Sequence, residues 1–171
     1  METSQYAIAE QETTFNQLVA ALLAELRIGE DIKLQLIGEQ SQFVRFNHAK
    51  VRQTGCVIDG QLHLTLMHDQ RSGFREIPFT GNWETDLPQA QQALKELRQD
   101  VADLPKDPYL VLPEGKATSR ESHAGNLLPP EAVAESVLSS VADLDFTGFY
   151  AAGSLIRAYA DSAGQKHWFA T

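Results

Sequence analysis

The sequence predicts an α+β fold in which a mostly antiparallel mixed sheet packs with about three helices. Apolar residues recur at helical spacing in three segments, and they alternate at strand spacing between and after these segments. Successive strand-like runs are separated only by short turns, which favours antiparallel neighbours. The 171 residues, of which 43% are hydrophobic and 22% charged, suffice for one domain with a buried core.

The first predicted element is a helix that begins at Thr14 and ends near Gly29. Its apolar residues recur every three or four positions: Phe15, Leu18, Val19, Leu22, Leu23 and Leu26. Thr14 and Gln17 have the spacing of a capping box, which marks a helix N-terminus. We expect residues 1–13 to form a flexible N-terminal segment, because little in them can be buried. Residues 14–171 then form the single domain.

A set of strands follows this helix. The first has one buried face, made by Ile32, Leu34 and Leu36. In the next stretch, residues 42–55, Val44 and Phe46 share a face, and Arg45 takes the other. Val51 is out of phase with Phe46, which indicates a bulge or turn near residues 48–50.

The sheet is expected to continue through a hairpin and an edge strand. Asp59-Gly60 is a hairpin signal, and it precedes three alternating apolar residues, Leu62, Leu64 and Leu66. Residues 73–81 read as a strand with Ile77 and Phe79 inward. Pro78 keeps this strand at an edge, because proline has no N–H to donate to a central ladder.

The second half of the chain predicts two helices, a long loop and two strands. One helix runs from about Leu87 to Leu104, and another, residues 129–141, has proline in its first turn and Val133 on its inner face. The loop between them, residues 105–128, is long and rich in turn residues. Residues 146–171 then predict two strands around a turn at Asp161–Gly164.

Charge and cysteine content limit the classes of partner. The net charge of −9 repels polyphosphate and anionic lipid, so we expect neither nucleic acid nor a membrane as a partner. The N-terminus has no basic, apolar signal sequence. A single cysteine, Cys56, excludes an intramolecular disulfide and is expected to be a small buried thiol. These features favour the cytoplasm.

Motif by motif, the residues predict no catalytic, cofactor-binding or metal site within the chain. The sequence "EGKATS" resembles the end of a phosphate loop, but Leu110 stands where the first glycine is needed and Ala117 follows the lysine. No histidine is followed by the Glu of a zinc helix, and His63 and His68 point to opposite faces of one strand. No serine lies in a nucleophile elbow. A small enzyme complete in these residues is therefore the least favoured class.

One polar strand, "QFVRFNHAKVRQTG", has two interpretations. Its basic residues can be solvent-exposed charges that protect a sheet edge from aggregation. Alternatively, the strand can present a binding face, since fixed donors of this kind suit peptide carbonyls and carboxylates. The candidate substrate-facing or domain-facing residues are Arg45, Asn47 and Gln53.

The order of segments resembles the N-terminal region of the TldD/PmbA family, formerly described as modulators of DNA gyrase. The resemblance covers most of the chain after residue 13. Its leading helix, Gly-x-Asp turn and strand correspond to "FNQLVAALLAELRIGEDIKLQL", and its next strand to "FVRFNHAKVRQTG". A helix ending in "LPKDPY" and the strand "FTGFYAAGSLIRAYADSAG" also match. At the last position the family commonly has Asn-Ser-x-Gly, where this chain has Asp161-Ser162-Ala163-Gly164.

The resemblance implies a parent protein that is a zinc metallopeptidase, a hydrolase of flexible peptides. It implies a homodimer or a heterodimer of two paralogues. In the family, a His-Glu-x-x-x-His helix and a later cysteine of a C-terminal domain hold the zinc, and Cys56 does not match that cysteine. We therefore expect this chain to be the N-terminal domain without the metallopeptidase domain, so that no family ligand is carried over.

Two functions remain open at this level. In the first, the domain is non-catalytic and helps to form the peptide cleft in contact with its own C-terminal domain. In the second, it is a non-enzymatic interaction or dimerisation module, including the case of an inactive paralogue. The interface would then involve exposed apolar groups around Phe149, Tyr150, Trp168 and Phe169.

Overall fold

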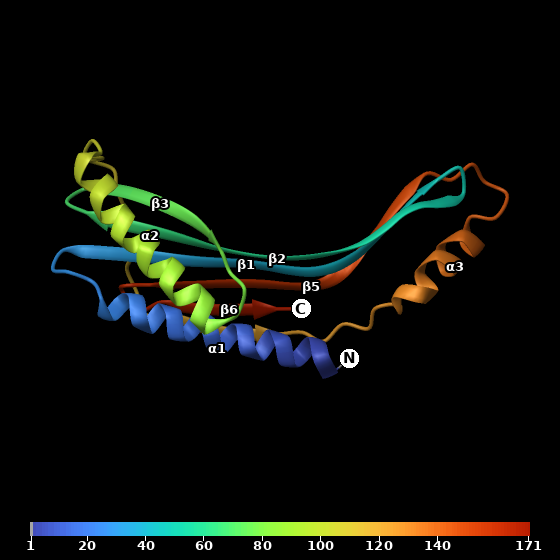
Figure 1. The fold of residues 1–171 in the computed structure, drawn as a ribbon, viewed down its shortest axis with the longest axis horizontal. Helices are drawn as coiled ribbons and strands as arrows, with labels where there is room; N and C mark the ends of the chain where they lie inside the picture. Colours follow the sequence, from blue (N-terminus) through green and yellow to red (C-terminus); the bar gives the residue numbers. More distant parts are fainter. Residues whose placement is uncertain (1) are drawn as a thin grey trace.

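The fold is a twisted sheet with helices on one face (Figure 1). The computed structural model describes the backbone of residues 2–171 and the side chains from residue 8 onwards. In chain order the elements are α1 (Glu2–Ala24), β1 (Glu30–Asn47), β2 (Lys50–His68), β3 (Arg71–Pro78), α2 (Trp83–Asp103), β4 (Thr118–Ser122), α3 (Pro130–Ser140), β5 (Gly148–Asp161) and β6 (Lys166–Ala170). The strand order is β3-β2-β1-β5-β6-β4, and only β4 and β6 are parallel neighbours. The predicted α+β class with a mostly antiparallel sheet is confirmed.

A long hairpin of β1 and β2 forms the centre of the sheet. The two strands pair from Glu30 and His68 to Asn47 and Lys50. The turn between them is His48–Ala49, and both residues have positive φ, as a type I′ turn requires. The register also shifts between Arg45 and Phe46. The predicted irregularity near residues 48–50 is thus a tight turn next to a bulge.

The central strands extend beyond their neighbours and form an arm. β3 pairs only with residues 61–68 of β2, and β6 only with residues 156–160 of β5. The remaining parts of the three central strands, residues 39–59 and 148–154, form a three-stranded ribbon that reaches to the right in Figure 1. We refer to this ribbon as the arm.

Asp59 and Gly60 do not form the predicted hairpin turn; they lie inside β2. Gly60 is paired with Gly38 of β1. Its carbonyl accepts a hydrogen bond of 2.7 Å from the amide of Phe79, where the chain leaves β3. A Cβ on Gly60 would lie 2.3 Å from the carbonyl oxygen of Phe79. The glycine therefore permits a close backbone approach rather than a turn.

The main core lies between the sheet and the helices α1 and α2. Alternate residues of β1 and β2 face these helices, as predicted, and each is at most 1% exposed: Ile32, Leu34, Leu36, Leu62, Leu64 and Leu66. A second cluster holds α3 against the arm through Val44, Phe46 and Val133. Pro130 begins α3, as expected from its fixed φ. All three helices therefore pack on the same face of the sheet.

Helix α1 begins at Glu2, so Thr14 is inside the helix and the predicted capping box is wrong. Residues 2–13, expected to be flexible, contain no glycine or proline and continue the helix. Thr14 is 6% exposed, and its hydroxyl donates to the carbonyl of Gly81 at 2.9 Å. The threonine thus fixes α1 to the loop before α2. The expectation for Met1 lies outside the described residues.

Helix α2 begins four residues before the predicted Leu87. Its N-cap is Asn82, whose side-chain oxygen accepts from the amide of Thr85 at 3.2 Å. Asp86, in the first turn, is buried and accepts hydrogen bonds from the amides of Thr80 and Gly81. None of the helices described within residues 2–171 has the length and apolar character needed to cross a membrane.

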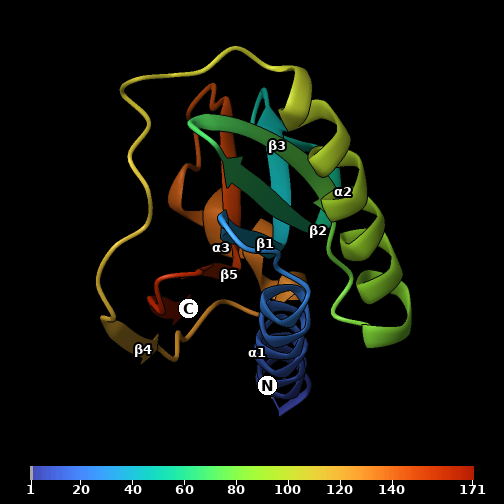
Figure 2. The ribbon, with the colours of Figure 1, turned by 90° about the vertical axis from the view of Figure 1, so that its left-hand side faces the viewer.

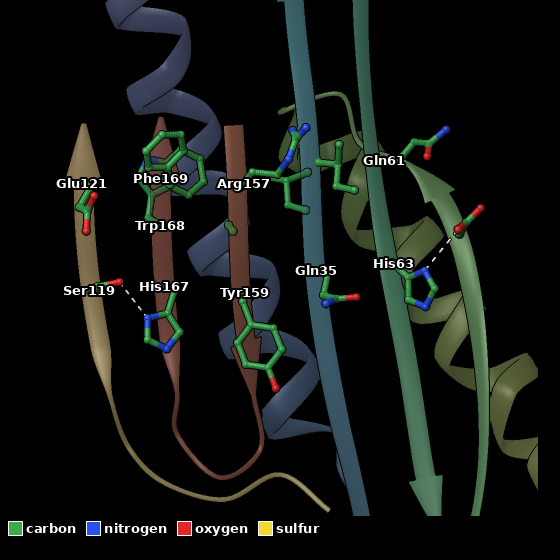
Figure 3. Close-up of a pocket in the computed structure, with 14 residues that line it drawn as sticks. Gln35, Gln61, His63, Ser119, Glu121, Arg157, Tyr159, His167, Trp168 and Phe169 are labelled. Carbon is green, nitrogen blue, oxygen red and sulfur yellow. Dashed lines mark hydrogen bonds and ion pairs between the residues drawn. The ribbon is translucent and has the colours of Figure 1, made fainter. Parts of the chain in front are cut away.

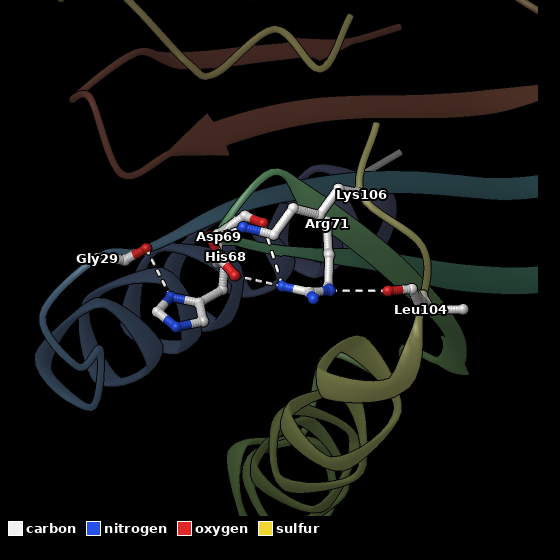
Figure 4. A network of polar contacts seen from close by, with 6 residues as sticks. All are labelled: Gly29, His68, Asp69, Arg71, Leu104 and Lys106. Atoms are coloured by element: carbon white, nitrogen blue, oxygen red, sulfur yellow. Dashed lines mark hydrogen bonds and ion pairs between the residues drawn. The ribbon is translucent and has the colours of Figure 1, made fainter. Parts of the chain in front are cut away.

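The long loop between α2 and α3 is tied to the sheet. Within the predicted loop, residues 118–122 form β4 beside β6 (Figure 2). Asp69, in the turn between β2 and β3, pairs with Arg71 and accepts from Lys106 at 2.6 Å (Figure 4). These hydrogen bonds, that of Lys106 first, lower the pKa of the Asp69 carboxyl. Arg71 also donates to the carbonyl of Leu104 at 2.7 Å, which fixes the start of the loop.

The close approach at Gly60 is testable by adding one methyl group. We expect Gly60→Ala to destabilise the fold by about 1–3 kcal/mol, because the Cβ would collide with a backbone carbonyl. The control is Gly125→Ala, which meets nothing within 4 Å and should change stability by less than about 0.5 kcal/mol. Urea unfolding measures both. Equal midpoints for the two variants would contradict this role for Gly60.

Candidate functional site

The sheet face turned away from the helices is bare, and we call it the open face. In Figure 3 it is turned towards the viewer, with helices behind the sheet. The strand registers place its side chains in rows that cross the sheet. One row consists of Gln61, Ile37, Arg157, Phe169 and Glu121. The next row consists of Glu76, His63, Gln35, Tyr159, His167 and Ser119.

These two rows line a hollow of about 410 Å³ on the open face. It is the candidate site because side chains from all six strands converge there. Aromatic, amide and cationic groups come from β1, β2, β5 and β6, and β3 and β4 add Glu76, Ser119 and Glu121. Ile37 is 50% exposed on its floor, although it lies in the central strand. The hollow therefore combines an apolar floor with polar groups that can orient a ligand.

Tyr159 occupies the middle of the hollow and is held by its neighbour along the strand. Its hydroxyl donates to Asp161 at 2.9 Å, and the same carboxylate accepts from the amides of Gly164 and Gln165. Burial, followed by the hydrogen bond and charge of Asp161, raises the pKa of Tyr159 to about 12. The phenol is therefore a fixed neutral group at neutral pH.

Two histidines flank the hollow. His63 contacts Glu76 at 3.3 Å and stacks on Phe74 with ring centroids 4.7 Å apart. His167 Nδ1 lies 2.8 Å from Ser119 Oγ. Because β2 and β6 are three strands apart, about 14 Å, the two histidines cannot share one metal ion.

The Ser119 and His167 pair has part of the geometry of an activated nucleophile. The other ring nitrogen of His167 lies 3.4 Å from the side-chain oxygen of Gln165. An amide oxygen carries no charge to stabilise an imidazolium, unlike the carboxylate of a catalytic triad. Ser119 and His167 therefore lack the charged third group of a catalytic triad.

Arg157 is the cation of the hollow. Its neighbours across the strands are Ile37 and Phe169. Its guanidinium donates only to backbone carbonyls, that of Ile156 at 2.8 Å and that of Gly38 at 3.5 Å. Within the described part of the chain, no carboxylate forms an ion pair with it. The guanidinium can therefore receive an external carboxylate or carbonyl.

The predicted site residues lie on the arm, away from the hollow. Arg45 and Gln53 are directly paired, share the open face and are exposed. The side chain of Asn47 accepts a hydrogen bond of 3.0 Å from the hydroxyl of Thr147. Along β1, eight residues separate Arg45 from the row of Arg157, a distance of about 26 Å. The structure therefore does not bring the predicted set to the hollow.

Sequence reasoning missed the residues that line the hollow. The alternation of Ile156 and Ala158 with Arg157 and Tyr159 was a usable signal for two faces of β5. It could not reveal that β6 and β4 add His167 and Ser119 to the same rows, because that depends on pairing over long sequence distances.

Two other expectations are corrected. Trp168 is 5% exposed in the main core, and Tyr150 packs against the α3 cluster, so the four aromatic residues 149, 150, 168 and 169 do not form one exposed patch. Phe149, at 65% exposed, does stand out from the arm. Cys56, expected to be buried, is exposed, because no helix covers its part of the arm.

The described residues do not fit a zinc site. In residues 2–171, no three His, Cys, Asp or Glu side chains are grouped so that they could hold a metal ion. His63 and His68 lie on different sides of β2, and His68 Nδ1 donates a hydrogen bond of 2.9 Å to the carbonyl of Gly29. The open face presents hydrogen-bonding, aromatic and charged side chains.

Comparisons with known proteins match the fold rather than the sequence. No protein-family model matches the chain, and a comparison with curated proteins finds no match. The fold is similar to that of TldE from Thermococcus kodakarensis, with a TM-score of 0.71 and 12% identity over 92% of this chain. A candidate modulator of a DNA gyrase from Thermotoga maritima matches with a TM-score of 0.62 and 13% identity over 94% of this chain. A candidate modulator of DNA gyrase from Bacteroides thetaiotaomicron matches with a TM-score of 0.54 and 16% identity over 99% of this chain.

The matched chains are much longer. This chain spans 37% of the first two and 38% of the third. Nearly all of it is therefore equivalent to one part of each of those proteins.

The environment of Tyr159 predicts a late step in an alkaline absorbance titration. The pKa of Tyr159 is raised from 10.0 to about 12, so the neutral phenol stabilises the folded state. This stabilisation is fully present below pH 10 and is lost as the pH rises to 12. We expect Tyr159→Phe to remove the late step and Tyr109→Phe, at an 86% exposed site, to leave it in place. A late step that persists in Tyr159→Phe would assign it to another residue.

Proposed function

We propose that this chain is the non-catalytic N-terminal domain of a longer protein of the TldD/PmbA kind, in which the open face forms one wall of a peptide-binding cleft. The observation that carries the proposal is the bare sheet face itself. It holds a hollow of about 410 Å³ and exposed apolar groups opposite a face that is packed with helices.

The fold comparisons support the placement in a longer protein. Between 92% and 99% of this chain is equivalent to 37–38% of each matched chain. A unit of this size leaves room for a second domain that would cover the open face. A sheet of this kind usually buries an apolar face against another layer, and Ile37 and Phe149 have none here.

The chemistry of the open face supports a role in holding peptide rather than in cleaving it. Within the described residues, Arg157 and Arg45 form no ion pair with a carboxylate, and Gln35 and Gln61 present amides. These groups suit peptide carbonyls and carboxylates. Hydrolysis would be performed by zinc in the C-terminal domain, since the described residues here do not fit a metal site.

A second candidate is a non-enzymatic interaction or dimerisation module, including an inactive paralogue. It is favoured by the apolar exposure of the arm, where Phe149 is 65% exposed and stacks on Phe43 with ring centroids 5.6 Å apart. In this case the open face would bind a second subunit or a client protein, and the longer protein would hold no zinc.

The two functions are separated by assays on the 171-residue chain beside the full-length product of the same gene. We expect bound zinc and cleavage of an unfolded peptide in the longer protein only. Cleavage by the 171-residue chain would overturn the assignment of a non-catalytic domain. Absence of both zinc and cleavage from the longer protein would favour the interaction module.

The wall is tested by removing its cations in the longer protein. We expect Arg157→Ala or Arg45→Ala to lower peptide turnover by about threefold to tenfold, as the loss of one solvent-exposed hydrogen bond would do. Zinc content and unfolding temperature should stay the same. Asn47→Ala should act in the same direction. The control is Lys95→Ala on the exposed side of α2, which should leave turnover unchanged. Unchanged kinetics in the arginine variants would return these residues to the role of solvated surface charges.

A further inference from the structure

The guanidinium of Arg157 has one edge without a partner. Both of its hydrogen bonds come from Nη1, and they go to the carbonyls of Ile156 at 2.8 Å and Gly38 at 3.5 Å. Among the described residues, no acceptor bonds to Nε or Nη2. These two nitrogens carry parallel N–H groups, which is the arrangement that both oxygens of a carboxylate accept together. The backbone therefore holds the arginine and leaves a carboxylate-binding edge free in the hollow.

Apolar and aromatic side chains lie next to this free edge. Ile37 and Phe169 are the direct neighbours of Arg157 on β1 and β6. Tyr159 follows two residues later on the same face, and its ring centroid lies 6.2 Å from that of His167 (Figure 3). A carboxylate bound to Arg157 would therefore have Ile37 beneath the rest of the molecule and aromatic rings at its side. Because aromatic rings attract one another in offset or edge-on contacts, a flat aromatic body suits these surroundings.

The distribution of charge in the hollow favours a ligand with one negative charge. Arg157 is the only arginine or lysine among the described residues that line the hollow. The two carboxylates of the lining, Glu76 and Glu121, lie on the outer strands β3 and β4, at the rim. A second negative charge, at the far end of a ligand bound to Arg157, would be moved towards one of these carboxylates and repelled. The site therefore suits a monocarboxylate better than a dicarboxylate.

The size of the hollow suits a small molecule. Its volume of about 410 Å³ is at the lower end of the range for small-molecule sites. The spacing from β1 across β5 to β6 is about 10 Å, which a body of two fused rings spans. Such a body would also cover Ile37, which is half-exposed, and so remove apolar surface from water.

We propose that the hollow binds a small aromatic monocarboxylate, with its carboxylate on Nε and Nη2 of Arg157 and its ring over Ile37. The inference goes beyond the proposed function, because it requires neither a peptide nor a second domain. The binding belongs to the 171-residue chain. Its failure would therefore leave the proposed function untouched, and the absence of zinc or cleavage from the longer protein would leave this site untouched.

The test is an NMR titration of the 171-residue chain with naphthalene-2-carboxylate. The measured quantity is the shift of each backbone amide signal as the acid is added. We expect saturable shifts at Gln35, Ile37, Arg157 and Phe169, with a dissociation constant below about 1 mM, as a ligand of this size can reach. The amide of Phe149, on the arm, should not shift, because it lies outside the hollow.

Three related compounds test the chemistry of the ligand. Naphthalene-2-carboxamide has the same shape without the charge, and should bind about tenfold more weakly or worse. The corresponding dicarboxylate, with a second charge at the far end, should also bind more weakly than the monocarboxylate. The saturated analogue, decalin-2-carboxylate, keeps the charge and loses the aromatic contacts, so its affinity should fall between those of the acid and the amide.

Matched variants test the role of the arginine. Arg157→Gln removes the charge and should weaken binding of the acid by about tenfold or more. Arg157→Lys keeps the charge but not the two parallel donors, so it should retain part of the affinity. The control is Arg52→Gln, which removes an exposed arginine from the arm and should bind like the original chain. The unfolding temperature of each variant checks that the fold is intact.

The proposal is overturned if the acid and its amide bind equally well, since the contact would then be apolar only. Unchanged affinity in both Arg157 variants, or shifts that occur on the arm and not in the hollow, would overturn it as well. Tighter binding of the dicarboxylate would contradict the assignment to a single negative charge. Loss of binding in Arg157→Gln, with full binding in the Arg52→Gln control, is the result that supports it.

Discussion

The antiparallel pairing of β1 with β2 on one side and with β5 on the other is the constraint on which the rest of the structure depends. Because these ladders keep one register over most of their length, each residue of β1 has a fixed face. Leu34 and Leu36 meet the helices, and Gln35 and Ile37 meet solvent. A shift of one residue would exchange the two sets. The ladder thus creates the core and the open face together.

The same pairing explains why the molecule has a body and an arm. The outer strands are short, so the helices α1 and α2 cover only the half of the sheet that all six strands share (Figure 1). The arm is held by the small cluster around Val133 of α3. Exposed apolar and cationic groups therefore gather on the arm and the open face, where the proposed contacts with peptide and a second domain lie.

Local patterns predicted the sheet better than the site. The alternation of apolar and polar residues correctly placed Leu62 and Leu64 in the core, because successive side chains of one strand point to opposite faces of the sheet. Asp59-Gly60 was misread as a turn, since the reason for its glycine is the carbonyl of Phe79, distant in sequence. The hollow was missed for the same kind of reason: its rows join residues such as His63 and His167 that only the strand order brings together.

The central claim is that the open face becomes covered in a longer protein. Hydroxyl-radical footprinting measures this directly, because it labels exposed side chains. The account predicts that Ile37, Arg157 and Phe169 are labelled in the 171-residue chain and become strongly protected in the full-length protein, while fully exposed Ile28 is labelled alike in both. Equal labelling of the open face in the two proteins would contradict the claim.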